Sequence, residues 1–362
     1  MSERSLTPPE IFEALRRRVV GQDAALREVA VAVSKHLLGH AASNLFLIGG
    51  SGSGKTTILR AVEELLRADP RLAGHATVVR LNANLLAELA GRGQQSGAVL
   101  ERLAAAARAQ LGGQASAARI KAAVEHGLVF VDEIDKIRSH VGDRPNVTGI
   151  VAQESLLTLM EGETQRLQVH TVDGPETVMV ETSRILFVAA GAFDELYDQV
   201  LERVSKVEGQ KVYKMVPRAD GSVQRLLSFK LARHLQHADL FAYGIVPQFL
   251  ARFSAVVTLR ELSTADLVAV FKEGPDAPYA SALAYFRGHD LDLRVTDEAM
   301  TYIAEQAAMQ PRLGARALRE VFGRIMRDLE FDPWGSGLVQ PTADGRTELV
   351  VDLETARARS QR

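Results

Sequence analysis

Short apolar runs alternate with amphipathic segments over the first two thirds of the chain. The runs are rich in β-branched residues and have no polar alternation, which is typical of strands buried on both faces of a parallel sheet. They occupy residues 44–49, 77–82, 128–132 and 184–190. Helical patterns separate them, so the sequence predicts an α/β fold in which helical crossovers cover both faces of the sheet. Residues 166–182 add a predicted hairpin that turns at Asp173-Gly174.

The pattern becomes mostly helical after residue 259 and ends with one predicted strand at 348–353. One helix, which Arg316 opens, carries an apolar stripe formed by Leu318, Val321, Phe322, Ile325, Met326 and Leu329. A length of 362 residues suggests about two to three domains. We predict a large α/β domain at 1–257, a smaller helical domain at 258–356 and a tail at 357–362.

Composition excludes several classes of protein. The formal net charge is −2, so no overall basic field attracts the chain to nucleic acid or anionic lipid. The absence of cysteine excludes disulfides, thiolate catalysis and cysteine-ligated zinc. No apolar run approaches the roughly 18 residues of a membrane span, and the N-terminus MSERSLTPPE has no signal-peptide core. We therefore expect a soluble, cytoplasmic protein.

The first apolar run is followed directly by GGSGSGKTT, which fits the phosphate-binding pattern G-x-x-x-x-G-K-[ST] and precedes a helical segment. Glycines let backbone amides turn inward around a polyphosphate, Lys55 supplies charge to the outer phosphates, and the Thr56 hydroxyl suits magnesium. The flanking strand and helix disfavour the alternative of an incidental glycine-rich turn. The predicted nucleotide-binding residues of this loop are Gly50, Ser51, Gly52, Ser53, Gly54, Lys55, Thr56 and Thr57.

A second apolar run ends in acids, in the sequence LVFVDEIDKI. Parallel sheets bind their ligands at the carboxyl ends of the strands, where Asp132 and Glu133 are expected. Asp132 suits a water-mediated magnesium contact, and Glu133 suits the general base that activates the attacking water. Together with the phosphate-binding loop, the two acids predict binding and hydrolysis of ATP with Mg²⁺.

Six segments follow one another along the chain: PEIFEALRRRVVGQDAALREVAVAV, GGSGSGKTT, AAVEHGLVFVDEIDKI, TSRILFVAAGAF, VPQFLARF and RLGARALREVFGRIMRDLEFD. In their order and in their residues they resemble the ClpX/HslU clade of AAA+ protein unfoldases, over roughly residues 9 to 332. The resemblance implies an AAA+ P-loop large domain with a smaller helical C-terminal domain. It also implies a hexameric ring whose nucleotide lies between subunits and between the two domains of one subunit.

Further site residues follow from the resemblance alone. It implies that Val19 and Val20 lie against adenine, that Arg252 is a finger reaching a neighbouring subunit's γ-phosphate, and that Arg316 is a sensor coupling the small domain to nucleotide. Such a finger contributes a factor of about 10³ to 10⁵ in turnover. Taken singly, each arginine is also explained as a solvated surface charge.

The sequence departs from this clade at two places that concern a peptidase partner. The clade's peptidase-docking loop is expected between residues 205 and 230, and no tripeptide that contains Gly-Phe occurs there. The C-terminal sequence ARARSQR also lacks the apolar tail with which HslU enters its own protease. We also expect neither the zinc module of ClpX nor the long insertion of HslU. We therefore expect a chaperone-type ATPase that remodels protein without a peptidase. A protease-associated unfoldase and a nucleic-acid motor or loader are the alternatives.

The stretch LAELAGRGQQSG joins two predicted helices through a flexible, polar elbow. Aligned without gaps, it falls on the clade's pore loop E-x-G-Y-V-G, which places Gly91 at the aromatic position, followed by Arg92 and Gly93. A shift of one register instead makes Arg92 the tip of an ordinary solvated loop. His234 and His237 have the i, i+3 spacing of one helix face, which we interpret as solvated rather than as a metal site.

Overall fold

The computed structural model describes residues 5–90, 95–208, 213–217, 223–227, 229–274, 276–310, 312–342 and 345–360. Two compact units are present. The α/β unit comprises Met1–Leu15, Ala24–Gly49 and Leu59–Leu259, and the C-terminal unit comprises Arg16–Asp23, Gly50–Ile58 and Arg260–Arg362. The phosphate-binding loop therefore groups with the C-terminal residues, although it follows a strand of the α/β unit directly.

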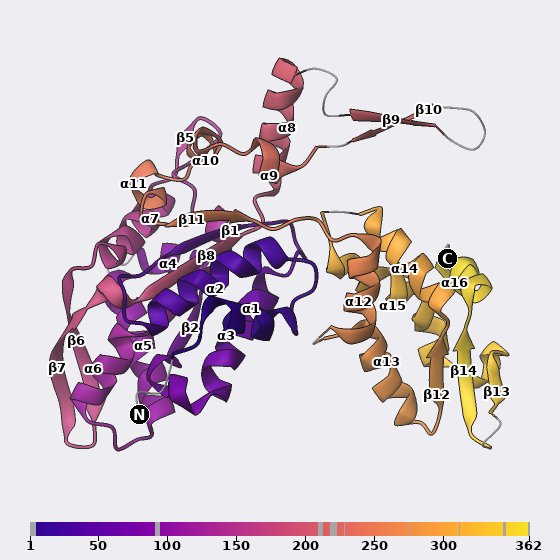
Figure 1. Cartoon of the computed structure of the whole chain (residues 1–362), viewed down its shortest axis with the longest axis horizontal. Coiled ribbons are helices and arrows are strands. Elements are labelled where there is room, and N and C mark those ends of the chain that lie inside the picture. Colours follow the sequence, from indigo (N-terminus) through magenta and orange to yellow (C-terminus); the bar gives the residue numbers. More distant parts are fainter. Residues whose placement is uncertain are drawn as a thin grey trace. The chain divides into compact units, whose positions relative to one another are not determined.

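A five-stranded parallel sheet forms the centre of the α/β unit, in the order β11-β1-β8-β3-β2 (Figure 1). Its strands are β1 (Leu45–Ile48), β2 (Val78–Asn82), β3 (Leu128–Asp132), β8 (Leu186–Gly191) and β11 (Ala255–Thr258). All four strand pairings are parallel. Neighbouring residues of a strand point to opposite faces, and both Phe46 and Leu47 of β1 are fully buried. Both faces of the sheet are therefore covered, which confirms the predicted α/β architecture.

Helices surround this sheet in the α/β unit. They are α1 (Pro8–Arg16), α2 (Asp23–Leu37), α3 (Lys55–Ala68), α4 (Ala83–Ala90), α5 (Gln95–Leu111), α6 (Ala117–Glu125), α7 (Val147–Met160), α8 (Asp194–Glu208), α9 (Leu231–His234), α10 (His237–Tyr243) and α11 (Pro247–Leu250). The described residues of this unit also form three antiparallel strand pairs: β4 (His140–Val141) with β5 (Arg144–Pro145), β6 (Thr164–Thr171) with β7 (Gly174–Glu181), and β9 (Tyr213–Pro217) with β10 (Val223–Leu227).

The turn of the β6–β7 hairpin lies one residue earlier than predicted. Thr171 pairs with Gly174, so Val172 and Asp173 form the two-residue turn instead of Asp173-Gly174. The Thr171 hydroxyl donates to the Gly174 carbonyl at 3.0 Å, and the Asp173 N–H donates to that hydroxyl at 3.3 Å. Gly174 instead occupies the first strand position with φ of 118°, a conformation that L side chains rarely adopt.

The C-terminal unit packs helices against a three-stranded sheet. Its elements are α12 (Thr264–Glu273), α13 (Pro278–Arg287), β12 (Asp292–Val295), α14 (Asp297–Ala308), α15 (Ala315–Phe331), β13 (Val339–Pro341), β14 (Thr347–Val351) and α16 (Leu353–Ser360). The predicted apolar stripe of α15 is buried along its whole length and packs with Phe271, Phe286 and Ile303. Strands β12 and β13 were not predicted, because runs of three or four residues carry too little periodicity.

Residues 357–360, predicted as part of a tail, form the last turn of α16 instead. Ala356 is fully buried, Arg357 lies over the Tyr302 ring at 5.8 Å, and Ser360 Oγ is 2.8 Å from the Tyr302 hydroxyl oxygen. The sequence of α16 has no apolar stripe, so its helical period carried no signal. These contacts and the Asp352 carboxylate, which accepts from the Thr355 N–H at 2.9 Å, hold the helix in place.

Three histidines from separate elements of the α/β unit pack together. The rings of His36 and His126 each lie 5.3 Å from the ring of His75, edge to face. His36 Nε2 donates to the His126 carbonyl at 3.1 Å, and the buried Nδ1 atoms of His36 and His75 have no partner among the described residues. Burial disfavours the charged form of these histidines, and repulsion from the neighbouring histidine rings adds to this effect. Together they lower the pKa of His36 to about 3 and the pKa of His75 to about 4.

This cluster predicts a loss of stability in mild acid. A histidine whose pKa is depressed by folding contributes stability above its unfolded pKa of about 6.5, and the contribution falls as pH drops toward the folded pKa. For His36, this linkage lowers the free energy of unfolding by about 2 kcal/mol between pH 7 and pH 5. Denaturant unfolding at both pH values should show a smaller loss in His36→Phe than in the wild type or in a control at exposed His170, His170→Gln. Equal losses in His36→Phe and the wild type would contradict this assignment.

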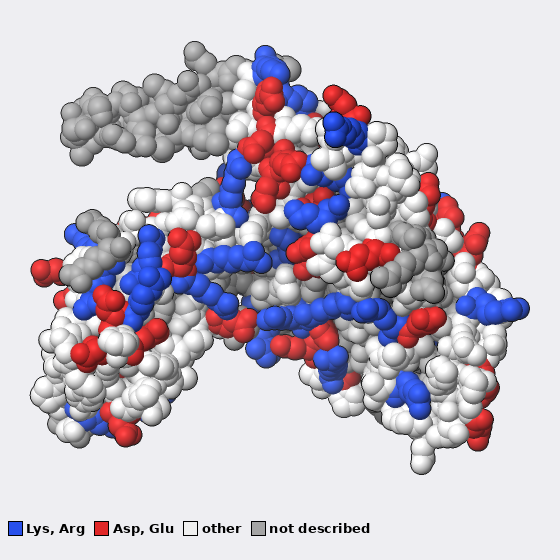
Figure 2. All heavy atoms as spheres, turned by 180° about the vertical axis from the view of Figure 1, so that it is seen from behind, with Lys and Arg blue, Asp and Glu red and all other residues white. Residues whose placement is uncertain are grey.

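Charged side chains of both signs are interspersed on the face of the molecule in Figure 2. Within the described residues, none of the helices combines the length and the apolar character needed to cross a membrane.

Candidate nucleotide site

The phosphate-binding loop runs from the end of β1 to the first residue of α3, Lys55. Gly52 and Gly54 have φ of 69° and 104°, which only glycine adopts readily. The Gly50 carbonyl accepts from the Ser53 N–H at 3.2 Å and from Lys55 Nζ at 2.9 Å. The loop thus folds back on itself ahead of the helix N-terminus, a location whose free N–H groups favour anions.

Glycine is also required here by the close approach of the segment before α15. A Cβ on Gly52 would overlap the Leu313 carbonyl oxygen and lie 2.9 Å from the backbone nitrogen of Arg316. The Gly52 carbonyl accepts from the Ala315 N–H at 3.1 Å. Within the C-terminal unit, Arg316, the second residue of α15, therefore lies directly beside the phosphate-binding loop.

The residues of the loop fit a nucleotide polyphosphate. The hydroxyl oxygens of Ser51 and Ser53 are buried and have no hydrogen-bond partner among the described residues. Buried polar atoms normally find a partner, and phosphate oxygens supply acceptors for both hydroxyls. Lys55 is 9% exposed and provides the positive charge. Thr56 is exposed at the second position of α3, and Thr57 is half-buried.

The acidic pair lies at the carboxyl edge of the central sheet. Asp132 is the last residue of β3, paired in register with Asn82 of β2, and is half-buried. Strand β8 lies between β3 and β1, and the Gly49 N–H donates to the Gly191 carbonyl at the end of β8 at 3.2 Å. Because these strands are parallel, the start of the phosphate-binding loop and the acids occupy the same edge.

Two asparagines that sequence reasoning missed hold the Glu133 carboxylate. Asn82 Nδ2 and Asn84 Nδ2 donate to Glu133 Oε2 at 2.9 and 3.1 Å, and the Asn84 N–H donates to Asn82 Oδ1 at 2.8 Å. Glu133 has φ of 58°, a left-handed conformation rare outside glycine that is often found at functional sites. The signal that the sequence offers is position: Asn82 ends β2, and Asn84 follows it two residues later, in the first turn of α4.

Comparisons with known proteins identify the family. Residues 45–212 match the family model described as "ATPase family associated with various cellular activities (AAA)". The protein named "ATP-dependent Clp protease ATP-binding subunit ClpX" from Porphyromonas gingivalis is 30% identical over 372 residues, covering 97% of this chain and 82% of the relative. The chain belongs to the ClpX family of AAA ATPases.

Other relatives carry the same name. The ClpX of Treponema denticola is 29% identical over 367 residues, with 96% of this chain and 80% of the relative covered. The ClpX of Azotobacter vinelandii is 28% identical over 349 residues, with 90% and 74% covered. The predicted resemblance is thereby confirmed. As a member of this family, the protein is an ATPase, and the loop and the acidic pair described above are its candidate nucleotide site.

The structure places the remaining residues predicted from the ClpX resemblance as follows. Val19 is 3% exposed, with Cγ1 at 4.0 Å from the position of a Cβ on Gly54, and Val20 is half-buried. Arg252 lies between α11 and β11, where Nη2 donates to Glu161 Oε1 at 2.6 Å. Val19 and Arg316 thus adjoin the phosphate-binding loop in the C-terminal unit. Arg252 belongs to the α/β unit with the acidic pair.

Gly91, Arg92 and Gly93 lie outside the described residues, which resume with α5 at Gln95. The flanking helices α4 and α5 are present as predicted. His234 and His237 do not share a helix face, because α9 ends at His234 and α10 begins at His237. His234 stacks on Phe229 at 5.4 Å between ring centroids.

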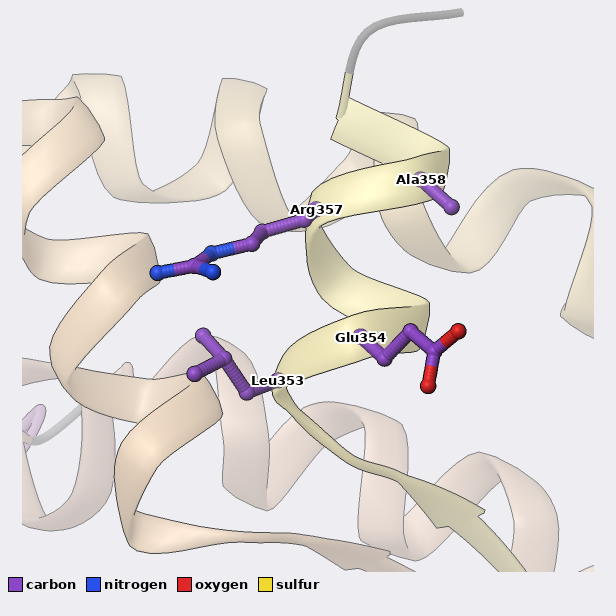
Figure 3. Close-up of a pocket in the computed structure, with 4 residues that line it drawn as sticks. All are labelled: Leu353, Glu354, Arg357 and Ala358. Carbon is purple, nitrogen blue, oxygen red and sulfur yellow. The ribbon is translucent and has the colours of Figure 1, made fainter.

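A pocket on α16 is lined by Leu353, Glu354, Arg357 and Ala358 (Figure 3). None of these four residues belongs to the predicted site. Its side chains come from a single helix, with Arg357 and Leu353 on one side and Glu354 on the other in the view of Figure 3. The pocket therefore lies apart in sequence from the residues of the candidate nucleotide site.

Proposed function

We propose that this protein is a ring-forming ATPase, hexameric in its active state, that uses ATP and Mg²⁺ to remodel protein substrates. One observation carries the proposal: a complete phosphate-binding loop and an Asp-Glu pair lie in an AAA fold, in a chain that aligns with one ClpX protein over 97% of its length. ATP hydrolysis supplies the free energy, and assembly is a condition of activity if Arg252 acts on an adjoining subunit.

Each residue has a distinct proposed role toward the nucleotide. The loop amides and Lys55 hold the phosphates, Val19 and Val20 contact adenine, and Arg316 senses nucleotide. Thr56 is a direct ligand of Mg²⁺, and Asp132 contacts it through water. Among the described residues, no group of three or more His, Cys, Asp and Glu side chains could hold a metal. Phosphate oxygens and water would complete the octahedral coordination that magnesium requires.

The Glu133 carboxylate is proposed to accept a proton from the attacking water. Mg²⁺ bound with the nucleotide neutralises phosphate charge. The Asn82 and Asn84 amides both bind Oε2 of Glu133, so Oε1 takes part in neither bond. They restrain the side chain in one orientation while it stays accessible, as expected for a positioned base.

The proposed pore loop predicts a weak grip on stable proteins. Gly91 and Arg92 offer little apolar surface, and contact contributes roughly 25 cal/mol per Å² of buried apolar area. Gly91→Tyr should therefore raise the rate of ATP-dependent unfolding of a tagged fluorescent reporter. Arg92→Glu should selectively weaken the binding of acidic substrates at low salt. Gly113→Tyr, at an exposed glycine with open space around it, is the matched control.

Unfolding by the wild type at the rate of Gly91→Tyr, with Arg92→Glu silent on every substrate, would contradict this placement of the loop. ATP hydrolysis by all these variants should stay near the wild-type rate, since none alters the nucleotide site. A wild type that hydrolyses ATP yet neither unfolds nor remodels any protein would overturn the proposed function itself.

We further propose that the ring works without a peptidase, because residues 205–230 contain no Gly-Phe tripeptide. A second candidate is favoured by the relatives, which are named ATP-binding subunits of a Clp protease. Purification of a Glu133→Gln ring in the presence of ATP separates the two: a co-purifying peptidase ring establishes the second candidate. Stimulation of ATP hydrolysis by DNA, lost at high salt, would instead indicate a nucleic-acid motor.

A further inference from the structure

A buried glutamine, Gln22, connects the phosphate-binding loop to the beginning of the C-terminal region. Its side chain is 2% exposed. Nε2 donates to the Ser53 carbonyl and to the Arg260 carbonyl, both at 2.9 Å, and Oε1 accepts from the Arg260 N–H at 3.1 Å. All three residues belong to the C-terminal unit. Both N–H groups of one carboxamide are thus engaged by two segments that are far apart in sequence.

The bond to Ser53 acts on the geometry of the phosphate-binding loop. In a planar trans peptide, the carbonyl and the following N–H point in opposite directions. Gln22 holds the Ser53 carbonyl, so the Gly54 N–H is turned to the opposite side of that peptide. Gly54 has φ of 104° and immediately precedes Lys55, at the position where loop amides meet phosphate.

The bond to Arg260 connects the same glutamine to α12. The Arg260 guanidinium pairs with both carboxylate oxygens of Asp266, at 2.7 and 3.0 Å. Asp266 also accepts from the Ser263 N–H at 2.8 Å in the capping box that begins α12. Gly21, with φ of 75°, lies against this ion pair, where a Cβ would come 2.6 Å from Asp266 Oδ1. Contacts therefore continue from the loop, through Gln22 and Arg260, to the helix cap.

We infer that Gln22 is a positioning residue for nucleotide binding, which orients the phosphate-binding loop and connects its state to the N-terminus of α12. The inference rests on the proposed role of the loop in binding nucleotide. One NH₂ group serves both carbonyls, so a shift of Ser53 on phosphate binding alters the hydrogen bonds to Arg260. The Arg260 amide is therefore a direct reporter of the loop.

The test compares Gln22→Met with Gln153→Met. Gln153 is fully buried in the α/β unit and makes the same set of bonds: Nε2 donates to Ile137 and Gly244, and Oε1 accepts from Val246. Methionine keeps the side-chain volume and removes all three bonds in each case. Both variants should lose comparable stability, whereas only Gln22→Met should weaken nucleotide affinity, by about tenfold, measured by titration calorimetry.

Kinetics and hydrogen exchange supply readouts that a purely structural role would not change. In Gln22→Met the KM for ATP should rise more than kcat falls. In the wild type and in Gln153→Met, nucleotide should slow hydrogen exchange at the Arg260 amide, and in Gln22→Met it should not. Equal affinities in the two variants, or Arg260 exchange that ignores nucleotide in the wild type, would overturn the inference. The wild-type exchange measurement decides the matter if Gln22→Met fails to fold, whereas a wild type that binds no nucleotide refutes the proposed site.

Discussion

Replacing Glu133 with glutamine is expected to lower the turnover of ATP by a factor of about 10² to 10⁴ while nucleotide binding persists. The glutamine side-chain oxygen still accepts from Asn82 and Asn84, so the local geometry survives. The change removes the ability to take a proton from water. Steady-state hydrolysis and equilibrium binding, measured on the same preparation, separate the two effects.

Lys55→Ala is the contrasting variant, because it should abolish binding itself. Its ammonium group lies inside the loop, 2.9 Å from the Gly50 carbonyl, and no other cation is part of the described loop.

The control for Glu133→Gln is Glu154→Gln, which removes one negative charge at an exposed acid on α7. It should leave both hydrolysis and nucleotide binding unchanged. Normal hydrolysis in Glu133→Gln would show that another group is the base.

The parts of the site that sequence predicts are those carried by continuous segments. Eight consecutive residues specify the phosphate-binding loop, and β3 ends at Asp132, with Glu133 as the next residue. The fold can also be predicted from the sequence, because strands that are buried on both faces appear as uninterrupted apolar runs. The apolar stripe of α15 was predicted for the same reason: its period is set by contacts within one element.

The parts that sequence does not predict depend on pairing between distant segments. The register of β2 against β3 brings Asn82 beside Asp132, and nothing local in either strand encodes that register. Gln22 is separated from Arg260 by more than two hundred residues, so its three hydrogen bonds have no pattern in the sequence. Helix α16 was missed because tertiary contacts such as those of Tyr302 outweigh its weak periodicity.

Arg252→Ala is expected to lower turnover more than Glu133→Gln does, by a factor of about 10³ to 10⁵, which corresponds to roughly 4 to 7 kcal/mol of barrier. The reason is that a guanidinium placed at the transferring phosphate stabilises charge that develops only in the transition state. Arg252→Lys should recover little, because an ammonium group lacks the planar fork that binds two phosphate oxygens.

The contact that Arg252 makes within its own subunit does not oppose this role. Its guanidinium pairs with Glu161 while 43% exposed, and a surface pair of this kind contributes only about 0 to 1 kcal/mol. Breaking the pair with Glu161 so that Arg252 can bind a phosphate therefore costs little free energy. Glu161→Gln is the matched control: it removes the partner charge and should leave hydrolysis at or above the wild-type rate.

Mixing experiments test whether Arg252 acts on the adjoining subunit. Arg252→Ala subunits retain Glu133, and Glu133→Gln subunits retain Arg252, so a mixed ring contains interfaces at which an intact base meets an intact finger. Each variant alone should be nearly inactive, whereas the mixture should regain part of the wild-type hydrolysis in proportion to those interfaces. Fluorescence energy transfer between labelled subunits would establish that exchange has occurred. If exchange is complete and hydrolysis stays absent, Arg252 does not complete the site of its neighbour, and its pairing with Glu161 is then its own structural role.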